Sequence, residues 1–241
     1  MLMKQFRKQY PYVLLGFLLI SYSFIAFKPI EKLSLNITAR SLQSGKSITA
    51  KGEVYYQVSG GLMVTHFTSP VENISITNAN GELRIYDPKS NTVMQKQASD
   101  FSSENSFFYF FLSNKTQDMG LAAAGYKLKY TRFEDKMVIT TWLPPEYLKS
   151  EFSKAEIVHE NYKPIFMAFY TPKGKPAIKV FYSGYQNVGD ISIPLTVTEF
   201  QYLAKGDSVI TKRTYGNLKT DAEVDIKYLN YKIPANAKVL K

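Results

Sequence analysis

Cysteine is absent from the 241 residues of this chain. Without a thiol the protein has no disulfide, no thiolate zinc site and no cysteine nucleophile. The absence also excludes a bacterial lipobox, so the protein is not itself a lipoprotein. Its stability must come from packing, and its 18 Tyr and 16 Phe supply side chains for a large core.

Histidine is almost as rare, and the only two, His66 and His159, belong to no HExxH or HxH pattern. A metal site needs several ligands, so we expect both to be ordinary strand residues. GxSxG, GxxxxGK[ST] and GxGxxG motifs are also missing. A pair of catalytic carboxylates stays open, although no acidic residue is singled out. We therefore predict no catalytic residue, no metal and no cofactor, and an enzyme is the least favoured class.

Acidic residues are outnumbered, because 20 Asp and Glu face 30 Lys and Arg, for a net charge of +10. Lys4, Arg7 and Lys8 lie in the first 27 residues, which contain no acid, so the rest of the chain carries 10 − 3 = +7. This modest positive field favours acidic partners or an anionic membrane surface. The lysines form no clustered stripe, which argues against nucleic acid as a partner.

Long apolar runs are missing except between Tyr12 and Phe27, directly after those three cations. The run is short for a membrane span of about 20 residues and typical of a secretory signal peptide. We predict that residues 1–27 are a cleaved signal peptide, with an uncleaved inner-membrane anchor as the alternative. In both cases residues 28–241 form an exported domain, because the positive charges stay in the cytoplasm.

Residues 52–94 show the alternation that is typical of half-buried strands. Turn signals separate the strands at Gly60-Gly61, Ser69-Pro70, Asn80-Gly81 and Asp87-Pro88. The residues that alternation places together are, strand by strand, Met63, Thr65 and Phe67; Ile74 and Ile76; and Leu83 and Ile85. One side of a sheet is therefore apolar.

This order of strands and turns, closing on Tyr86-Asp87-Pro88, resembles the start of the outer-membrane lipoprotein carrier family (LolA-like). The end of the chain is similar to that family too, with turns at Ile193-Pro194, Gly206-Asp207, Gly216-Asn217 and Ile233-Pro234. The resemblance spans about residues 30–240. It implies a mainly β fold, an unclosed antiparallel β-barrel of about eleven strands with one or two helices as a lid over a hydrophobic concave face. A meander of any secreted β-sandwich is the alternative.

An abruptly apolar segment, residues 107–112, lies between the two β halves. Ser102 or Ser103 is placed to cap a short helix, and Asn114 to end it. Such a helix has apolar side chains in all directions and must be covered on most sides. An ordinary buried helix or strand fits this pattern, whereas the resemblance implies the family's lid. The family's lid-holding arginine aligns with Ser59, so that latch is missing here.

Residues 29–42, where the family has an N-terminal helix, fit either a helix or a strand. Leu33 and Ile37 are at near-helical spacing, but Asn36 to Thr38 suit a strand equally. Further strands are expected across the second half, for example where Tyr126, Leu128 and Tyr130 alternate with polar residues.

The predicted lipid-binding surface combines strand residues with the lid. Its members are Met63, Phe67, Ile74, Ile76, Leu83, Ile85, Leu128, Tyr130, Phe107, Phe108, Phe111 and Leu112. Each buried CH₂ of an acyl chain contributes about 0.8 kcal/mol, so a lined groove can carry a lipid without covalent chemistry.

The resemblance implies a periplasmic carrier that takes the acyl chains of lipoproteins, or another lipid, toward the outer membrane. Its expected partners are membrane-associated donor and acceptor proteins, and it is expected to be a monomer. The alternatives are an envelope sensor of the same fold and a structural β protein without a cavity.

Overall fold

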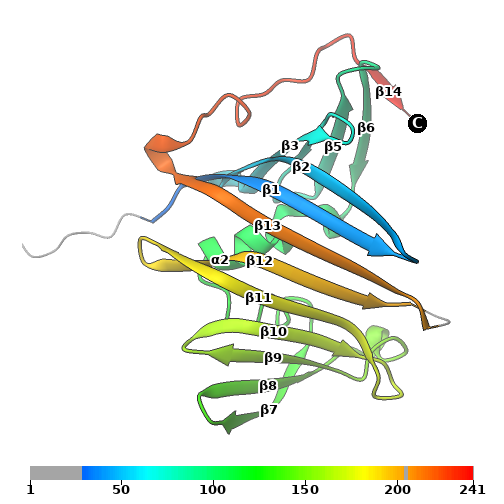
Figure 1. Cartoon of the computed structure of the whole chain (residues 1–241), viewed down its shortest axis with the longest axis vertical. Coiled ribbons are helices and arrows are strands. Elements are labelled where there is room, and N and C mark those ends of the chain that lie inside the picture. The colour runs from blue at the N-terminus through cyan, green and yellow to red at the C-terminus, as the bar shows by residue number, and fades with distance from the viewer. Residues whose placement is uncertain (1–28, 204–205, 241) are drawn as a thin grey trace, which may run out of the picture.

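Short alternating segments along the whole chain pair into one large antiparallel sheet (Figure 1). The computed structural model describes residues 29–203 and 206–240. The predicted leader, residues 1–27, lies outside the described residues. The sheet order is β14-β6-β5-β4-β3-β2-β1-β13-β12-β11-β10-β9-β8-β7, and its edges do not meet. Only β14 runs parallel to its neighbour, β6.

The strands follow the chain in fourteen pieces. They are β1 (Lys32–Gln43), β2 (Lys46–Gln57), β3 (Leu62–Ser69), β4 (Asn73–Thr77), β5 (Glu82–Asp87), β6 (Thr92–Gln97), β7 (Lys127–Glu134), β8 (Met137–Leu143), β9 (Lys154–Glu160), β10 (Lys163–Tyr170), β11 (Pro176–Val188), β12 (Ile191–Tyr202), β13 (Ser208–Thr220) and β14 (Lys238–Leu240). The helical elements are α2 (Phe107–Leu112) and the 3₁₀ turns η2 (Ser59–Gly61), η3 (Ser99–Phe101), η4 (Ser103–Asn105), η5 (Glu146–Leu148) and η7 (Asp221–Glu223).

The unclosed, mainly β architecture is as expected, but two details of the expectation are wrong. The sheet has fourteen strands where about eleven were predicted. In the described part of the chain, α2 is the one α-helix. The segment left open between helix and strand is β1, because Leu33, Leu35 and Ile37 alternate with polar residues and pair with β13 across the sequence.

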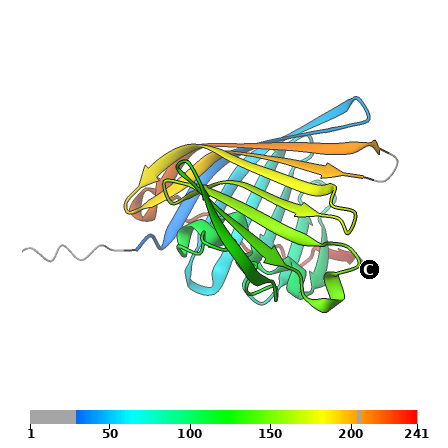
Figure 2. The same cartoon turned by 90° about the horizontal axis from the view of Figure 1, so that it is seen from below.

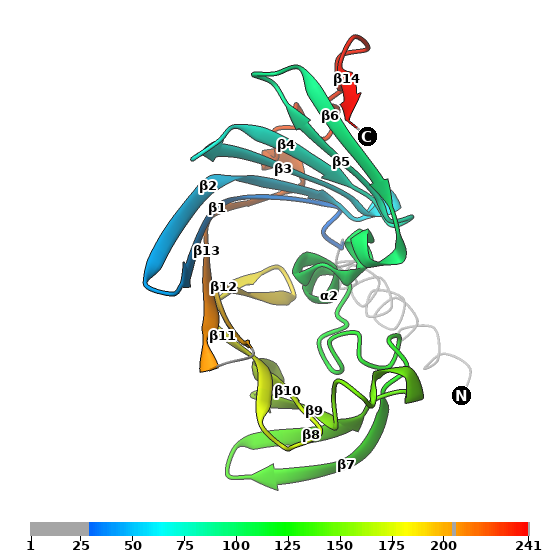
Figure 3. The same cartoon turned by 90° about the vertical axis from the view of Figure 1, so that its right-hand side faces the viewer.

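The sheet curls around α2 and the loop after it, as Figures 2 and 3 show. Irregular pairings in β1, β2, β7 and β10 help the sheet to bend. The inner face and the loop share one apolar cluster. Its buried members are Leu33, Leu35, Ile37, Val54, Tyr56, Phe108, Phe111, Met119, Leu121, Tyr126, Trp142, Ala155, Ile157, Met167, Tyr182, Ile193, Val197 and Tyr215.

The outer face of the first half is covered by the end of the chain. After η7 the chain crosses this face and adds β14 beside β6 (Figure 1). A second apolar cluster lies under this crossing, with Tyr55, Val64, Ile74, Tyr86, Val93, Val224 and Leu229 buried. The first half of the sheet is therefore covered on both faces.

Tyr228 anchors the crossing segment, because its ring stacks on His66 at 4.6 Å and lies 5.1 Å from the ring of Tyr55. We expect Tyr228→Ala to lower the free energy of unfolding by about 2 kcal/mol, through lost aromatic contacts and a cavity. Urea unfolding measures this. Tyr147→Ala, at a side chain that is 72% exposed, should change stability by less than about 0.5 kcal/mol. Equal effects at both positions would contradict the role of Tyr228.

Candidate functional site

The predicted helix over residues 107–112 is confirmed as α2 (Phe107–Leu112). Its cap differs from the expectation, because the Ser106 side chain accepts a hydrogen bond from the Tyr109 N–H at 3.2 Å. Ser102 instead caps the preceding turn η4. The chain leaves the helix through Asn114, whose φ of 52° ends the helical conformation as predicted.

Aromatic side chains of α2 fill the space in front of the sheet. The Phe107 ring stacks on Tyr215 with centroids 5.3 Å apart. Phe108 meets the same ring edge-on at 5.5 Å. Phe111 lies 6.1 Å from Tyr182 and is 3% exposed. The helix is therefore an aromatic plug seated on the inner face.

The plug segment is tied to the sheet at its two ends. At the first end, the Ser103 N–H donates to the Asn78 carbonyl at 3.0 Å, and the Ser102 hydroxyl donates to the Ala79 carbonyl at 2.8 Å. At the second, the Thr116 carbonyl lies 2.8 Å from His159 Nε2. Within the described residues, the hydrogen bonds of α2 between these ends stay inside the segment. Apolar packing alone holds the helix against the sheet.

Ser59, which aligns with the family's latch arginine, lies in the exposed turn η2. Its carbonyl accepts a hydrogen bond from Gln57 Nε2 at 3.2 Å. No side-chain hydrogen bond from Ser59 to α2 is present in the described part of the chain. The plug therefore lacks a polar latch at this position.

The wall behind the plug is aromatic and uncharged. Burial raises the pKa of Tyr215 to about 12, even though Arg213 nearby lowers it. Burial raises the pKa of Tyr182 and Tyr185 as well. These phenols therefore stay neutral at physiological pH, and the Tyr185 hydroxyl donates to the Pro164 carbonyl. Such a wall suits the methylenes of an acyl chain.

Two hollows flank the plug, and both reach Asn114. One, of about 500 Å³, lies between the loop after α2 and the strands β7 and β8, where Leu128 and Trp142 line it. The other, of about 200 Å³, runs from Phe111 to Tyr162 at the β9–β10 turn. The plug is thus bordered by open space where it faces the second half of the sheet.

Most of the predicted lining lies where it was expected. Met63, Phe67, Phe107 and Leu112 pack against the inner cluster, and Phe108 and Phe111 are buried in it. Leu83 and Ile85 are half-buried on the same face of the sheet as Met63, because the register pairs Thr77 with both Met63 and Leu83. Leu128 lines the larger hollow, although it is 52% exposed.

Ile74 and Ile76 were assigned to the wrong face. They pair with His66 and Val64 and pack in the outer cluster under the C-terminal segment. Alternation shows which residues of one strand share a face, but it does not relate that face to the next strand across a turn.

Tyr130 also faces outward. An irregularity between Leu128 and Tyr130 pairs Leu128 with Trp142 but Tyr130 with Thr141, on the opposite face of β8. The extra residue reverses the alternation that the sequence suggested.

Sequence reasoning missed several residues of the wall. Tyr56, Tyr182, Tyr185 and Tyr215 form most of its aromatic surface. Strand alternation around Tyr182 was visible in the sequence, but the identity of its partner face depends on the pairing of β11, β12 and β13.

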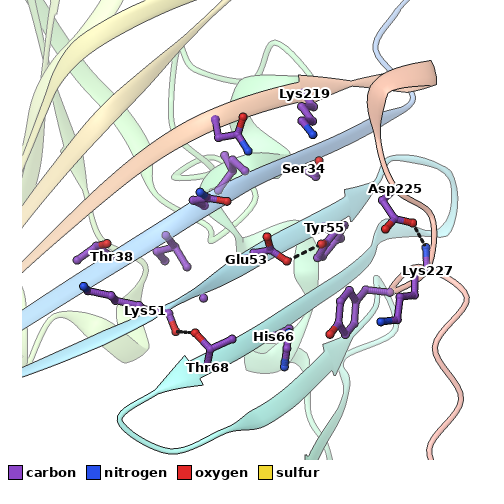
Figure 4. Close-up of a pocket in the computed structure, with 16 residues that line it drawn as sticks. Ser34, Thr38, Lys51, Glu53, Tyr55, His66, Thr68, Lys219, Asp225 and Lys227 are labelled. Atoms are coloured by element: carbon purple, nitrogen blue, oxygen red, sulfur yellow. Dashed lines mark hydrogen bonds between the residues drawn. The ribbon is translucent and has the colours of Figure 1, made fainter.

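A third hollow, of about 640 Å³, lies on the outer face beside the crossing C-terminal segment. Figure 4 shows polar side chains of both charges around it, among them Lys51, Glu53 and Asp225. Glu53 accepts a hydrogen bond from the Tyr55 hydroxyl at 2.7 Å, and His66 Nε2 lies 3.0 Å from Glu72. This polar surface does not suit an acyl chain.

Two searches of the described residues bear on function. They contain no cluster of three or more His, Cys, Asp or Glu arranged to hold a metal ion. Among their helices, none is long and apolar enough to cross a membrane.

Comparison with known proteins identifies the fold. No family model and no curated protein matches the sequence. A DUF1329 family protein from Desulfovibrio piger matches with a TM-score of 0.59 and 14% identity, over 85% of this chain and 92% of that one. A domain proposed to be an outer membrane lipoprotein-sorting protein, from Vibrio parahaemolyticus, matches with a TM-score of 0.56 and 13% identity, over 83% and 89%.

A LolA superfamily protein from Nitrosomonas europaea matches with a TM-score of 0.54 and 13% identity, over 83% of this chain and 91% of that one. At such identities the likeness concerns the fold, and the strand order, the curl and the inner helix described above all belong to that likeness. This chain has the LolA-like fold.

Proposed function

We propose that this protein is an exported carrier that holds the acyl chains of a lipoprotein, or of another lipid, between the inner face of its sheet and α2. The observation that carries the proposal is the plug, an aromatic helix seated on a neutral aromatic wall by packing alone. A helix fixed at both ends and free of polar ties in between can move aside without breaking hydrogen bonds to the sheet.

The free energies support an exchange of plug for lipid. Removing Phe108 and Phe111 from the inner face costs about 1.5 to 3 kcal/mol each. An acyl chain that buries about ten methylenes in the same space contributes about 8 kcal/mol. Binding therefore offsets the opening of the plug. While no lipid is bound, the plug covers apolar surface that would otherwise promote aggregation.

Carriage across the periplasm toward the outer membrane is the transport step that this architecture supports. The predicted leader would export the domain, and membrane-associated proteins would donate and accept the cargo. The Vibrio parahaemolyticus domain of the same fold is proposed to act in lipoprotein sorting. The missing latch at Ser59 favours loading that needs no energy-driven release of the helix.

Two half-buried apolar residues on neighbouring strands test which face binds lipid. Met63 faces the inner cluster and Ile76 the outer one. We expect Met63→Gln to weaken binding of a fluorescent fatty acid about tenfold, because the unpaired amide costs about 1 to 3 kcal/mol in an apolar site. Ile76→Gln should leave the affinity unchanged.

Native mass spectrometry of the purified wild type should show co-purified lipid. The carrier proposal fails if wild type neither carries lipid nor binds the fatty acid. Equal weakening by both substitutions would instead contradict the assignment of the inner face.

A further inference from the structure

Two hairpin tips expose aromatic side chains at one end of the sheet. Phe133 ends β7 next to the turn into β8, and it is 76% exposed. Tyr162 lies in the turn between β9 and β10, and it is 98% exposed. The two tips are neighbours, because Met137 of β8 pairs with Glu160 of β9.

The backbone at Tyr162 makes its exposure unusual. Asn161 and Tyr162 form a two-residue turn with φ values of 49° and 63°. Glycine is strongly favoured at the second position of such a turn, and a bulky side chain with positive φ is strained. A ring that is 98% exposed gains no packing that offsets the strain. The side chain therefore points to a contact outside the folded chain.

This end of the sheet is also where the plug is accessible. The hollow of about 200 Å³ is lined by Tyr162 and Lys163 at its rim and by Phe111 of α2 at its base. β1 begins at the same end, at Lys32, after the first described residues (Figures 1 and 2). The apolar run from Tyr12 to Phe27 precedes this point in the sequence.

The chemistry of the tips fits a lipid surface better than a protein. Three cations and three anions flank them, namely Arg132, Lys136, Lys163, Glu134, Asp135 and Glu160. This balance gives no net attraction to a charged partner. Two aromatic rings on separate turns do not form the apolar patch of roughly 800 Å² that a stable protein interface needs on each side. Phe and Tyr side chains suit the boundary between headgroups and acyl chains.

We propose that Phe133 and Tyr162 insert into the headgroup region of a phospholipid bilayer and bring the hollow in front of Phe111 to the membrane surface. The purpose of this contact, transfer of an acyl chain between bilayer and inner face, rests on the function proposed above. The contact itself does not.

Because the chain contains no cysteine, single labels can be placed in the full-length protein. Tyr162→Cys and Phe133→Cys, each carrying a polarity-sensitive fluorophore, are mixed with phosphatidylcholine vesicles that contain a headgroup-region spin label. We expect the fluorescence of both to shift to the blue and to be quenched at least about twofold. The matched control is Ile48→Cys, at a side chain that is 66% exposed near the opposite end of the sheet, and it should show neither effect.

A second variant tests the contact without a label. Tyr162→Gly places the favoured residue in the turn, so the protein should fold at least as well as wild type. With Phe133→Ser added, it should transfer a fluorescent lipid out of vesicles about tenfold more slowly than wild type. Its affinity for a fatty acid already dissolved in buffer should be unchanged, because Met63 and the plug are intact.

The outcomes separate the two proposals. Quenching at Tyr162 no stronger than at Ile48 overturns the membrane contact, even if fatty acid binds. Quenching at Tyr162 only after a membrane protein is added to the vesicles overturns it as well, in favour of a protein partner. Quenching at both tips in a protein that binds no fatty acid supports the contact and refutes the carrier.

Discussion

Phe111→Ala is expected to bind a fatty acid about 10- to 100-fold more tightly than wild type. Truncating a buried Phe removes about 3 to 5 kcal/mol from the packed state that contains it. Here that state is the closed plug, because Phe111 packs between Phe107, Tyr182 and Tyr185. A less stable plug leaves more of the protein open, and apparent affinity rises with the fraction that is open.

Titration of a fluorescent fatty acid measures this gain, and bis-ANS fluorescence of the lipid-free variant should rise with it. Phe166→Ala is the matched control, since Phe166 packs against Phe181 on the outer face, away from α2. It should lower stability without changing the affinity for lipid. If Phe111→Ala only destabilises the protein and no lipid binds, α2 is ordinary core and the protein is a structural β domain.

A plug that cannot leave should abolish binding altogether. Phe107 and Tyr215 lie ring on ring, with centroids 5.3 Å apart and planes at 14°. In a chain without cysteine, Phe107→Cys with Tyr215→Cys supplies one defined pair of thiols. Joining them with a short bifunctional thiol reagent ties α2 to β13. We expect the affinity for fatty acid to fall by about 100-fold or more, because the open state is removed.

The same double variant before crosslinking should bind at least as tightly as wild type, because it has lost the stacked rings. Each single variant treated with the reagent shows whether modification by itself blocks the site. Unchanged affinity after crosslinking would mean that the acyl chain binds somewhere other than behind α2. The outer hollow around Glu53 and Lys51 would then be the next site to examine.

Local patterns in the sequence were sufficient for the elements whose structure depends on neighbours along the chain. Six apolar residues between Ser106 and Asn114 formed the predicted helix, because its cap and its end are both local. Met63 and Phe67 shared one face because side chains alternate within a strand. The resemblance to the lipoprotein carrier family, carried by the order of turns, predicted the unclosed sheet.

Pairing between distant segments decided the rest. Residues 29–42 are a strand because β13, about 180 positions later, hydrogen-bonds to them. Ile74 and Ile76 face outward because the turn after β3 relates the two strands in a way that alternation within one strand does not reveal. Their partner, the segment from η7 to β14, has too little regular pattern of its own to predict where it packs. The sequence by itself determined which residues are apolar together, whereas the tertiary structure decided which face each group covers, because that choice is made by contacts between residues far apart in the chain.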